Sequence, residues 1–137
     1  FNKPELEARC AKVAEYGERI RVSQVNAIEF IHDHREKDFF FFIDPPYYGK
    51  GRTLYLNKLN HEYHERLTNL LQGMEDAAWV LTYDDCPEIR SMYHDWANVR
   101  SFSLRYAAAK RQSGREILIT PQWMQLPTEQ NSAAIEW

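Results

Sequence analysis

The chain has 137 residues, which is enough for one domain with a substantial core but hardly for two. Hydrophobic residues make up 44% of the sequence, as is typical of a folded globular protein, and no apolar run approaches the roughly 20 residues of a membrane-spanning helix. Residues 1–20 lack the pattern of a signal peptide. The formal net charge of −3 counts mildly against nucleic acid as a partner, because DNA-binding proteins are usually basic.

Alternating helical and strand periodicities predict an α/β domain. The predicted elements, in chain order, are a helix at Pro4–Tyr16, a strand at Arg19–Val25, a helix at Ala27–His34, a strand at Asp38–Ile43, a helix at His61–Gln72, a strand at Ala77–Tyr83, a helix at Pro87–Trp96, and strands at Val99–Tyr106 and Glu116–Thr120. Asn26 suits the N-cap of the second helix. The strand at 38–43 is strongly apolar, which predicts that both of its faces are buried, as in a parallel sheet.

The order of these elements predicts a mostly parallel sheet that ends in an antiparallel hairpin, because a short connection joins the last two strands. We expect residues 1–120 to form one domain and residues 121–137 to form a loosely held tail. Cys10 and Cys86 lie far apart in the sequence and show no metal-like spacing, so we expect two reduced thiols in a cytosolic protein.

The segment Asp44-Pro45-Pro46-Tyr47 follows the most hydrophobic predicted strand. In open α/β sheets, ligands bind outside the carboxyl ends of the strands, so the segment stands in the right place for chemistry. Its two prolines remove two backbone donors, which leaves the Asp44 carboxylate and the proline carbonyls as acceptors beside an aromatic ring. The alternative interpretation is a rigid turn that only ends the strand.

This arrangement suits a flat substrate that carries an NH2 group. The exocyclic amine of adenine is a poor nucleophile, because its lone pair is delocalised into the ring. Two acceptors, one on each N–H, would favour a more tetrahedral nitrogen whose lone pair points toward an electrophilic methyl group. Tyr47 can stack on the base, which must first be flipped out of the duplex to be reached.

Three segments of the chain resemble a known family. FFFFIDPPYYGKG resembles motif IV of the adenine-N6 DNA methyltransferases related to the Dam methylase, the D12 class. VLTYDDCPEIRSMY and SLRYAAAKRQSGREILIT resemble later segments of that family, so the resemblance covers roughly residues 19–120. The resemblance implies a Rossmann-like methyltransferase fold, S-adenosylmethionine as methyl donor and no metal. It also implies methylation of adenine N6 in duplex DNA by a cytoplasmic enzyme of a bacterium or phage.

The same resemblance assigns roles to individual residues. Asp44 and the Pro45 carbonyl would hold the adenine amine, and Tyr47 would stack on the flipped base. Asn26 stands where relatives often carry an Asp near the adenine of the cofactor, so Asn26 and Asp44 are the candidate cofactor contacts. For Asn26, the helix N-cap is the alternative role.

Two features of the family are missing from the sequence. Family members begin with a Gly-rich cofactor loop of the Phe-x-Gly-x-Gly kind, and they place a target-recognition segment before motif IV. Neither is found here. We therefore expect a C-terminal catalytic piece, with little activity alone, whose exposed apolar surface favours self-association.

Two groups of basic residues are candidate contacts for DNA phosphates. One group follows the Pro-Pro pair, and the other lies on the predicted hairpin. The candidates are Lys50, Arg52, Arg105, Lys110, Arg111 and Arg115. For both groups, an ordinary solvated loop is the alternative.

Other polar and aromatic residues receive structural interpretations. Asp84 or Asp85 is expected to cap the helix that follows rather than to hold a metal. Trp79 and Trp96 are expected in the core. The histidines, which show no complete set of metal ligands, are expected to face solvent; they are His32, His34, His61, His64 and His94.

The sequence leaves other functions open. A related Pro-Pro-Tyr motif, usually led by Asn, serves RNA-adenine and protein-glutamine methyltransferases, which also act on a planar amine or amide. The basic hairpin favours nucleic acid over protein. A non-enzymatic remnant that binds DNA or a partner chain is the third possibility.

Overall fold

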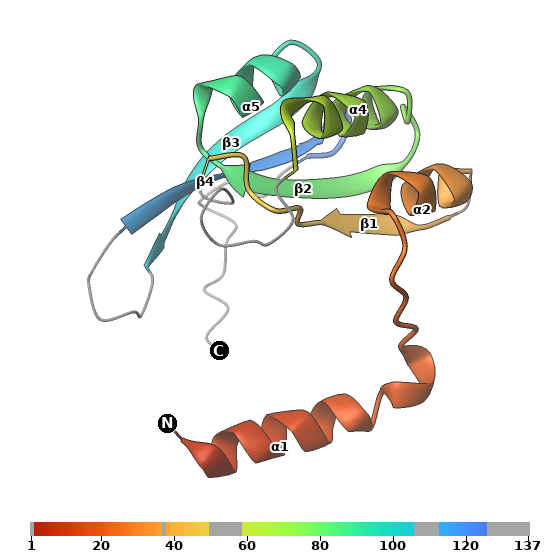
Figure 1. The fold of residues 1–137 in the computed structure, drawn as a ribbon, viewed down its shortest axis with the longest axis vertical. Helices are drawn as coiled ribbons and strands as arrows, with labels where there is room; N and C mark the ends of the chain where they lie inside the picture. The colour runs from red at the N-terminus through yellow and green to blue at the C-terminus, as the bar shows by residue number, and fades with distance from the viewer. Residues whose placement is uncertain (1, 37, 50–58, 106–112, 126–137) are drawn as a thin grey trace.

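The computed structural model describes residues 2–36, 38–49, 59–105 and 113–125. Its elements are α1 (Lys3–Ala14), a 3-10 turn η1 (Gly17–Arg19), α2 (Ala27–His34), β1 (Phe40–Ile43), α4 (His61–Gln72), β2 (Ala78–Asp84), α5 (Pro87–Tyr93), β3 (Ala97–Arg105) and β4 (Ser113–Pro121). Figure 1 shows one sheet with α2, α4 and α5 beside it, and α1 away from it. No helix in the described ranges is long and apolar enough to cross a membrane.

The sheet is mixed, so the prediction of a mostly parallel sheet was wrong. Its strand order is β1-β2-β4-β3. β1 and β2 are parallel, whereas β4 runs antiparallel to both β2 and β3. The predicted hairpin of β3 and β4 is confirmed, with Val99 opposite Ile119. Because β4 lies between β2 and β3, the two hairpin strands form half of the four-stranded sheet.

Two asparagine caps set the starts of α2 and α4, two of the three helices that cover the sheet. The Asn26 side chain accepts hydrogen bonds from the backbone N–H groups of Ile28 and Glu29, at 3.0 and 3.4 Å. Asn60 accepts from the N–H of Tyr63 at 2.9 Å. Such caps satisfy backbone donors that a first helical turn leaves unpaired. The predicted bounds of α2 and α4 are confirmed, whereas α5 ends three residues earlier than predicted.

The strand predicted at 19–25 does not form. The chain passes through η1 and then runs to Asn26 without regular structure, with every residue exposed. A strand needs a partner for its backbone groups, and this segment lies away from the sheet in Figure 1. Alternation of apolar and polar residues was therefore not sufficient to place Ile20, Val22 and Val25 in a sheet.

β1 is buried on one face only, contrary to the prediction. Phe41 and Ile43 lie in the core, whereas Phe40 and Phe42 are 60% and 68% exposed. In the part of the chain that the structure describes, β1 pairs only with β2, and the helices pack on the face that bears Phe41 and Ile43.

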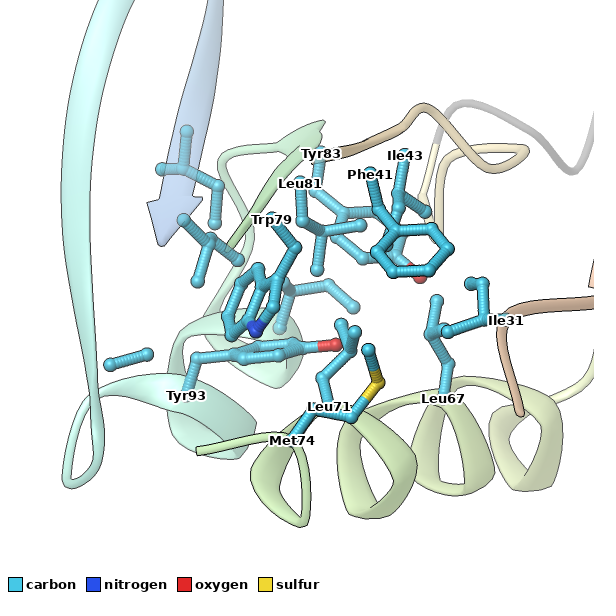
Figure 2. Close-up of a cluster of buried hydrophobic side chains, with 14 of the residues drawn as sticks. Ile31, Phe41, Ile43, Leu67, Leu71, Met74, Trp79, Leu81, Tyr83 and Tyr93 are labelled. Atoms are coloured by element: carbon cyan, nitrogen blue, oxygen red, sulfur yellow. The ribbon is translucent and has the colours of Figure 1, made fainter. Parts of the chain in front are cut away.

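The core fills the space between the sheet and its three helices. Figure 2 shows side chains of β1 and β2 facing those of α4 and α5. Fully buried side chains include Trp79, Leu81, Leu67 and Tyr93. Burial of each of the two leucines stabilises the fold by an amount on the order of 1.5–3 kcal/mol. The core placement predicted for Trp79 is confirmed. This packing fixes the carboxyl ends of β1 and β2 side by side, where the chain continues into residues 44–49.

Candidate active site

Three polar side chains from neighbouring strands border the segment Asp44–Tyr47. They are Thr82 and Asp84 of β2 and Glu116 of β4. Thr82 and Asp84 are two residues apart, and Asp84 lies opposite Glu116 in the antiparallel pair. Because side chains alternate along a strand, all three leave the sheet on the face opposite Leu81 and Tyr83. The three polar side chains therefore leave the strands on one face and Leu81 and Tyr83 on the other, and the chain after β1 reaches both, since Tyr47 and Tyr48 also pack against the core.

Asp44 comes directly after β1 and is exposed. Its Oδ1 accepts a hydrogen bond from the Thr82 hydroxyl at 2.6 Å. This bond orients the carboxylate. A carboxylate has about four acceptor positions, so Asp44 retains the capacity to accept from a ligand as well.

Tyr47 is held through its hydroxyl group. The hydroxyl donates to Oε2 of Glu116 at 2.9 Å, and Glu116 itself is only 4% exposed. Burial, the hydrogen bond to Glu116 and the charge of Asp44 raise the pKa of Tyr47 well above its usual value. The hydroxyl therefore remains a donor at neutral pH. The Tyr47 ring lies 6.4 Å from the Tyr83 ring, centroid to centroid.

Asp84 holds the backbone that follows Tyr47. Its Oδ1 accepts from the N–H of Tyr48 at 3.0 Å, and its Oδ2 accepts from the N–H of Gly49 at 2.8 Å. The prediction that Asp84 or Asp85 caps α5 was wrong. The N-cap position is Cys86, and no side chain caps that helix.

Asp85 instead belongs to a cluster with two arginines. Arg90 donates to both of its oxygens, at 2.5 and 3.0 Å, and Ser101 donates to Oδ2 at 3.2 Å. The hydrogen bond from Arg90 is the main reason that the pKa of Asp85 lies below its usual value. Arg115 reaches Oδ2 at 3.5 Å while its side chain stays 70% exposed.

Among the residues predicted to contact DNA, only Arg115 has a side chain that the structure describes. Arg105 ends β3, but its side chain lies outside the described part. The other four candidates also lie outside the described residues: Lys50, Arg52, Lys110 and Arg111. Asn26 caps α2, which is the alternative that the sequence left open beside cofactor contact.

Two histidines lie against the loop after Tyr47. His64 is buried, with its Nδ1 2.7 Å from the Tyr83 hydroxyl, so the prediction that it faces solvent was wrong. Nδ1 of His61 lies 3.1 Å from the Tyr48 hydroxyl. The Tyr48 ring contacts the His64 ring at 5.2 Å between centroids. Burial lowers the pKa of His64, which keeps the ring neutral.

Sequence reasoning did not identify Thr82, Asp84 and Glu116 as partners of the Asp44–Tyr47 segment. A signal was present for Thr82 and Asp84, which are polar residues within and at the end of an otherwise apolar strand, whereas Glu116 follows three non-apolar residues of β4 and gave no such signal. Buried polar residues in strands require hydrogen-bond partners, and here the partners come from the chain after β1.

Comparison with protein families identifies one family for the chain. A model of the D12 class N6 adenine-specific DNA methyltransferases matches residues 1–112. The chain belongs to this family. The match includes β1, β2 and the Asp44–Tyr47 segment, and it extends to α1, beyond the part where the sequence resemblance began. A search among curated proteins finds no match.

Family membership bears on the chemistry of the site. Members of this methyltransferase family modify adenine in DNA, and methyltransferases generally use S-adenosylmethionine. An acceptor-rich, proline-containing segment with an adjacent aromatic ring fits an amine-bearing base.

Proposed function

We propose that this chain forms the base-binding part of an S-adenosylmethionine-dependent methyltransferase acting on N6 of an adenine flipped out of duplex DNA. Family membership supports the proposal. The observation that carries it is the pairing of Asp44 with Thr82 and of Tyr47 with Glu116 at the carboxyl ends of β1 and β2. An acceptor and an aromatic ring are thereby oriented beside each other before any base arrives.

Each group has a defined part in this reaction. The Asp44 carboxylate accepts one N–H of the adenine amine, and the Pro45 carbonyl accepts the other. Together they turn the nitrogen lone pair out of conjugation with the ring. Transfer would form the N–C bond as the methyl C–S bond of the cofactor breaks and the neutral thioether leaves. The nitrogen would then be positively charged, the Asp44 carboxylate would stabilise that charge, and one N–H proton would be lost to solvent. Pro46 keeps a competing backbone N–H away from these acceptors.

Asn26 and Asp44 are the residues that we propose for the cofactor. Bound S-adenosylmethionine supplies an electrophilic methyl group on a cationic sulfur. The exposed Asp44 carboxylate fits that positive charge. The Asn26 oxygen already accepts from Ile28 and Glu29, so only its NH2 group is available to donate to the cofactor. Because this set is small, we expect weak cofactor binding and little turnover by this chain alone.

Duplex DNA is the proposed substrate, with basic side chains on its phosphates. The exposed Arg115, which lies beside Asp85, supports this placement. The further proposed phosphate contacts are Lys50, Arg52, Arg105, Lys110 and Arg111. Such contacts position the duplex without reading its sequence.

Self-association is a separate proposal, supported by β1. Phe40 and Phe42 project from an edge strand and are more than half exposed. An exposed apolar edge favours pairing with another chain, and a second copy of this one would cover it.

Stacking in the base pocket is tested by binding to DNA that contains 2-aminopurine, a fluorescent analogue of adenine. This base carries its amine at C2 instead of C6, so it reports on Tyr47 and not on the acceptors proposed for the N6 amine. Placed opposite an abasic site, 2-aminopurine is unpaired and costs little to extrude. We expect Tyr47→Ala to weaken binding of this duplex roughly 5- to 150-fold, because base stacking contributes about 1–3 kcal/mol. Binding of a fully paired duplex of the same length should not change.

The full chain must also prefer the unpaired duplex. Equal affinity of the unmodified chain for the two duplexes would contradict stacking of an extruded base on Tyr47. An equal effect of Tyr47→Ala on both would show that Tyr47 contacts the backbone instead. The same titration with a single-stranded RNA probe that contains adenine separates a DNA substrate from an RNA substrate.

A further inference from the structure

Asp84 is an unusual residue for its location. It is 5% exposed at the end of a strand that packs in the core, where an unpaired carboxylate would be strongly destabilising. Its two oxygens accept from consecutive backbone N–H groups, those of Tyr48 and Gly49. Two bonds to adjacent peptide groups fix both the position and the direction of the chain, whereas a single bond would leave it free to rotate.

Gly49 matches this carboxylate sterically. A Cβ atom at residue 49 would lie 2.7 Å from Asp84 Oδ2, closer than real Cβ contacts occur. None of the glycines in the described ranges has a positive φ, so backbone conformation does not explain the glycine. The close approach of the peptide to the carboxylate does.

The contacts of Tyr48 extend this restraint. The Tyr48 hydroxyl lies 3.1 Å from Nδ1 of His61, and its ring packs against His64. Tyr47 therefore stands between a proline and a residue that is held through both its backbone and its side chain. Glu116 holds the far end of Tyr47 itself.

We propose that Asp84 is a positioning residue, whose carboxylate fixes the Tyr48–Gly49 backbone so that Tyr47 presents its ring to the flipped adenine. This inference rests on the proposed function. Asp84 acts through Tyr47 and does not itself contact the base. Substitutions of Asp84 should therefore weaken base binding to the extent that they loosen the Tyr48–Gly49 backbone, and not to the extent that they destabilise the whole domain.

The restraint is measured by amide hydrogen exchange of the full chain, followed by NMR. Asp84→Asn has the same shape, but its NH2 group faces one of the two backbone donors. We expect the Tyr48 and Gly49 amides to exchange roughly tenfold faster or more, because a charge-assisted bond is lost. The amide of Leu81 in the core should be unaffected. Asp76→Asn, an exposed acid at the other end of β2, is the matched control and should change neither amide.

The positioning role is measured by a double-mutant cycle on binding of the 2-aminopurine duplex. Gly49→Ala should weaken binding roughly fivefold or more in the unmodified chain, but by less than about twofold in Asp84→Ala, because the added Cβ then meets no carboxylate. Such suppression would not arise if Asp84 only stabilised the fold. If Asp84→Ala does not fold, the single variants Gly49→Ala and Asp84→Asn decide the matter.

The outcomes separate this inference from the proposed function. Unchanged exchange in Asp84→Asn would overturn the restraint itself. Faster exchange with unchanged binding of the 2-aminopurine duplex would overturn the positioning role and leave the proposed function standing. A chain that binds paired and unpaired duplexes equally would overturn both, even where the exchange result agrees.

Discussion

The hydrogen bond between Tyr47 and Glu116 gives a prediction with a definite size. Tyr47→Phe keeps the ring and removes only the hydroxyl that donates to Glu116 at 2.9 Å. Glu116 is almost fully buried, so its carboxylate loses a donor that solvent does not readily replace. Charge-assisted bonds of this kind contribute about 1.5–3 kcal/mol, and because Tyr47 is half-buried we expect the lower end, about 1.5 kcal/mol.

Urea denaturation measures this loss. With a slope of about 1–3 kcal/mol per molar urea, the midpoint should fall by roughly 0.5–1.5 M while the slope stays constant. The matched variant is Glu116→Gln, which keeps an acceptor oxygen but removes the charge. In the Glu116→Gln background, the effect of Tyr47→Phe should shrink to that of a neutral hydrogen bond from the half-buried Tyr47 hydroxyl, about 0.5–1 kcal/mol.

Base binding provides a second measurement on the same variant. The phenylalanine ring can still stack, so Tyr47→Phe should bind the 2-aminopurine duplex more tightly than Tyr47→Ala does. Strictly additive effects of Tyr47→Phe and Glu116→Gln on stability would refute the proposed coupling between the two side chains.

Two further predictions concern pH and association. Burial lowers the pKa of His64 below 6.5, so the unfolded chain binds the proton more readily than the folded chain does. The free energy of unfolding should therefore decrease as the pH falls below 6.5. The decrease should be no more than about 1.4 kcal/mol per pH unit. Thermal melts should show this slope reduced in His64→Gln and retained in His94→Gln, an exposed control; equal slopes in both would contradict it. Phe42→Lys, on the exposed face of β1, should lower the mass measured by light scattering, whereas a monomeric unmodified chain would remove the basis for self-association.

Local sequence signals predicted the ends of those helices and strands that a capping side chain or a proline marks. Asn26 was expected to cap a helix, and its side chain does accept from the first turn of α2. Asn60 caps α4 in the same way, although it was not singled out from the sequence. Such an interaction requires only neighbouring residues. The β3–β4 hairpin was predictable because a short connection admits only an antiparallel return. The prolines at 45 and 46 end β1 for a similarly local reason.

Tertiary structure alone decided which strands pair and which side chains meet. No local pattern places β4 between β2 and β3, and that placement brings Glu116 to Tyr47 across 69 positions of sequence. The segment at 19–25 alternates as a strand would, yet it has no partner strand in the described part of the chain.

The sequence by itself predicted the family, which the family model confirms, and it singled out the segment that we propose for the base, because Asp44-Pro45-Pro46-Tyr47 carries its acceptors and its aromatic ring within four consecutive residues. The structure decided how that segment is held. Thr82, Asp84 and Glu116 act on it from strands that are distant in sequence, and their roles depend on a register that only the packed sheet defines.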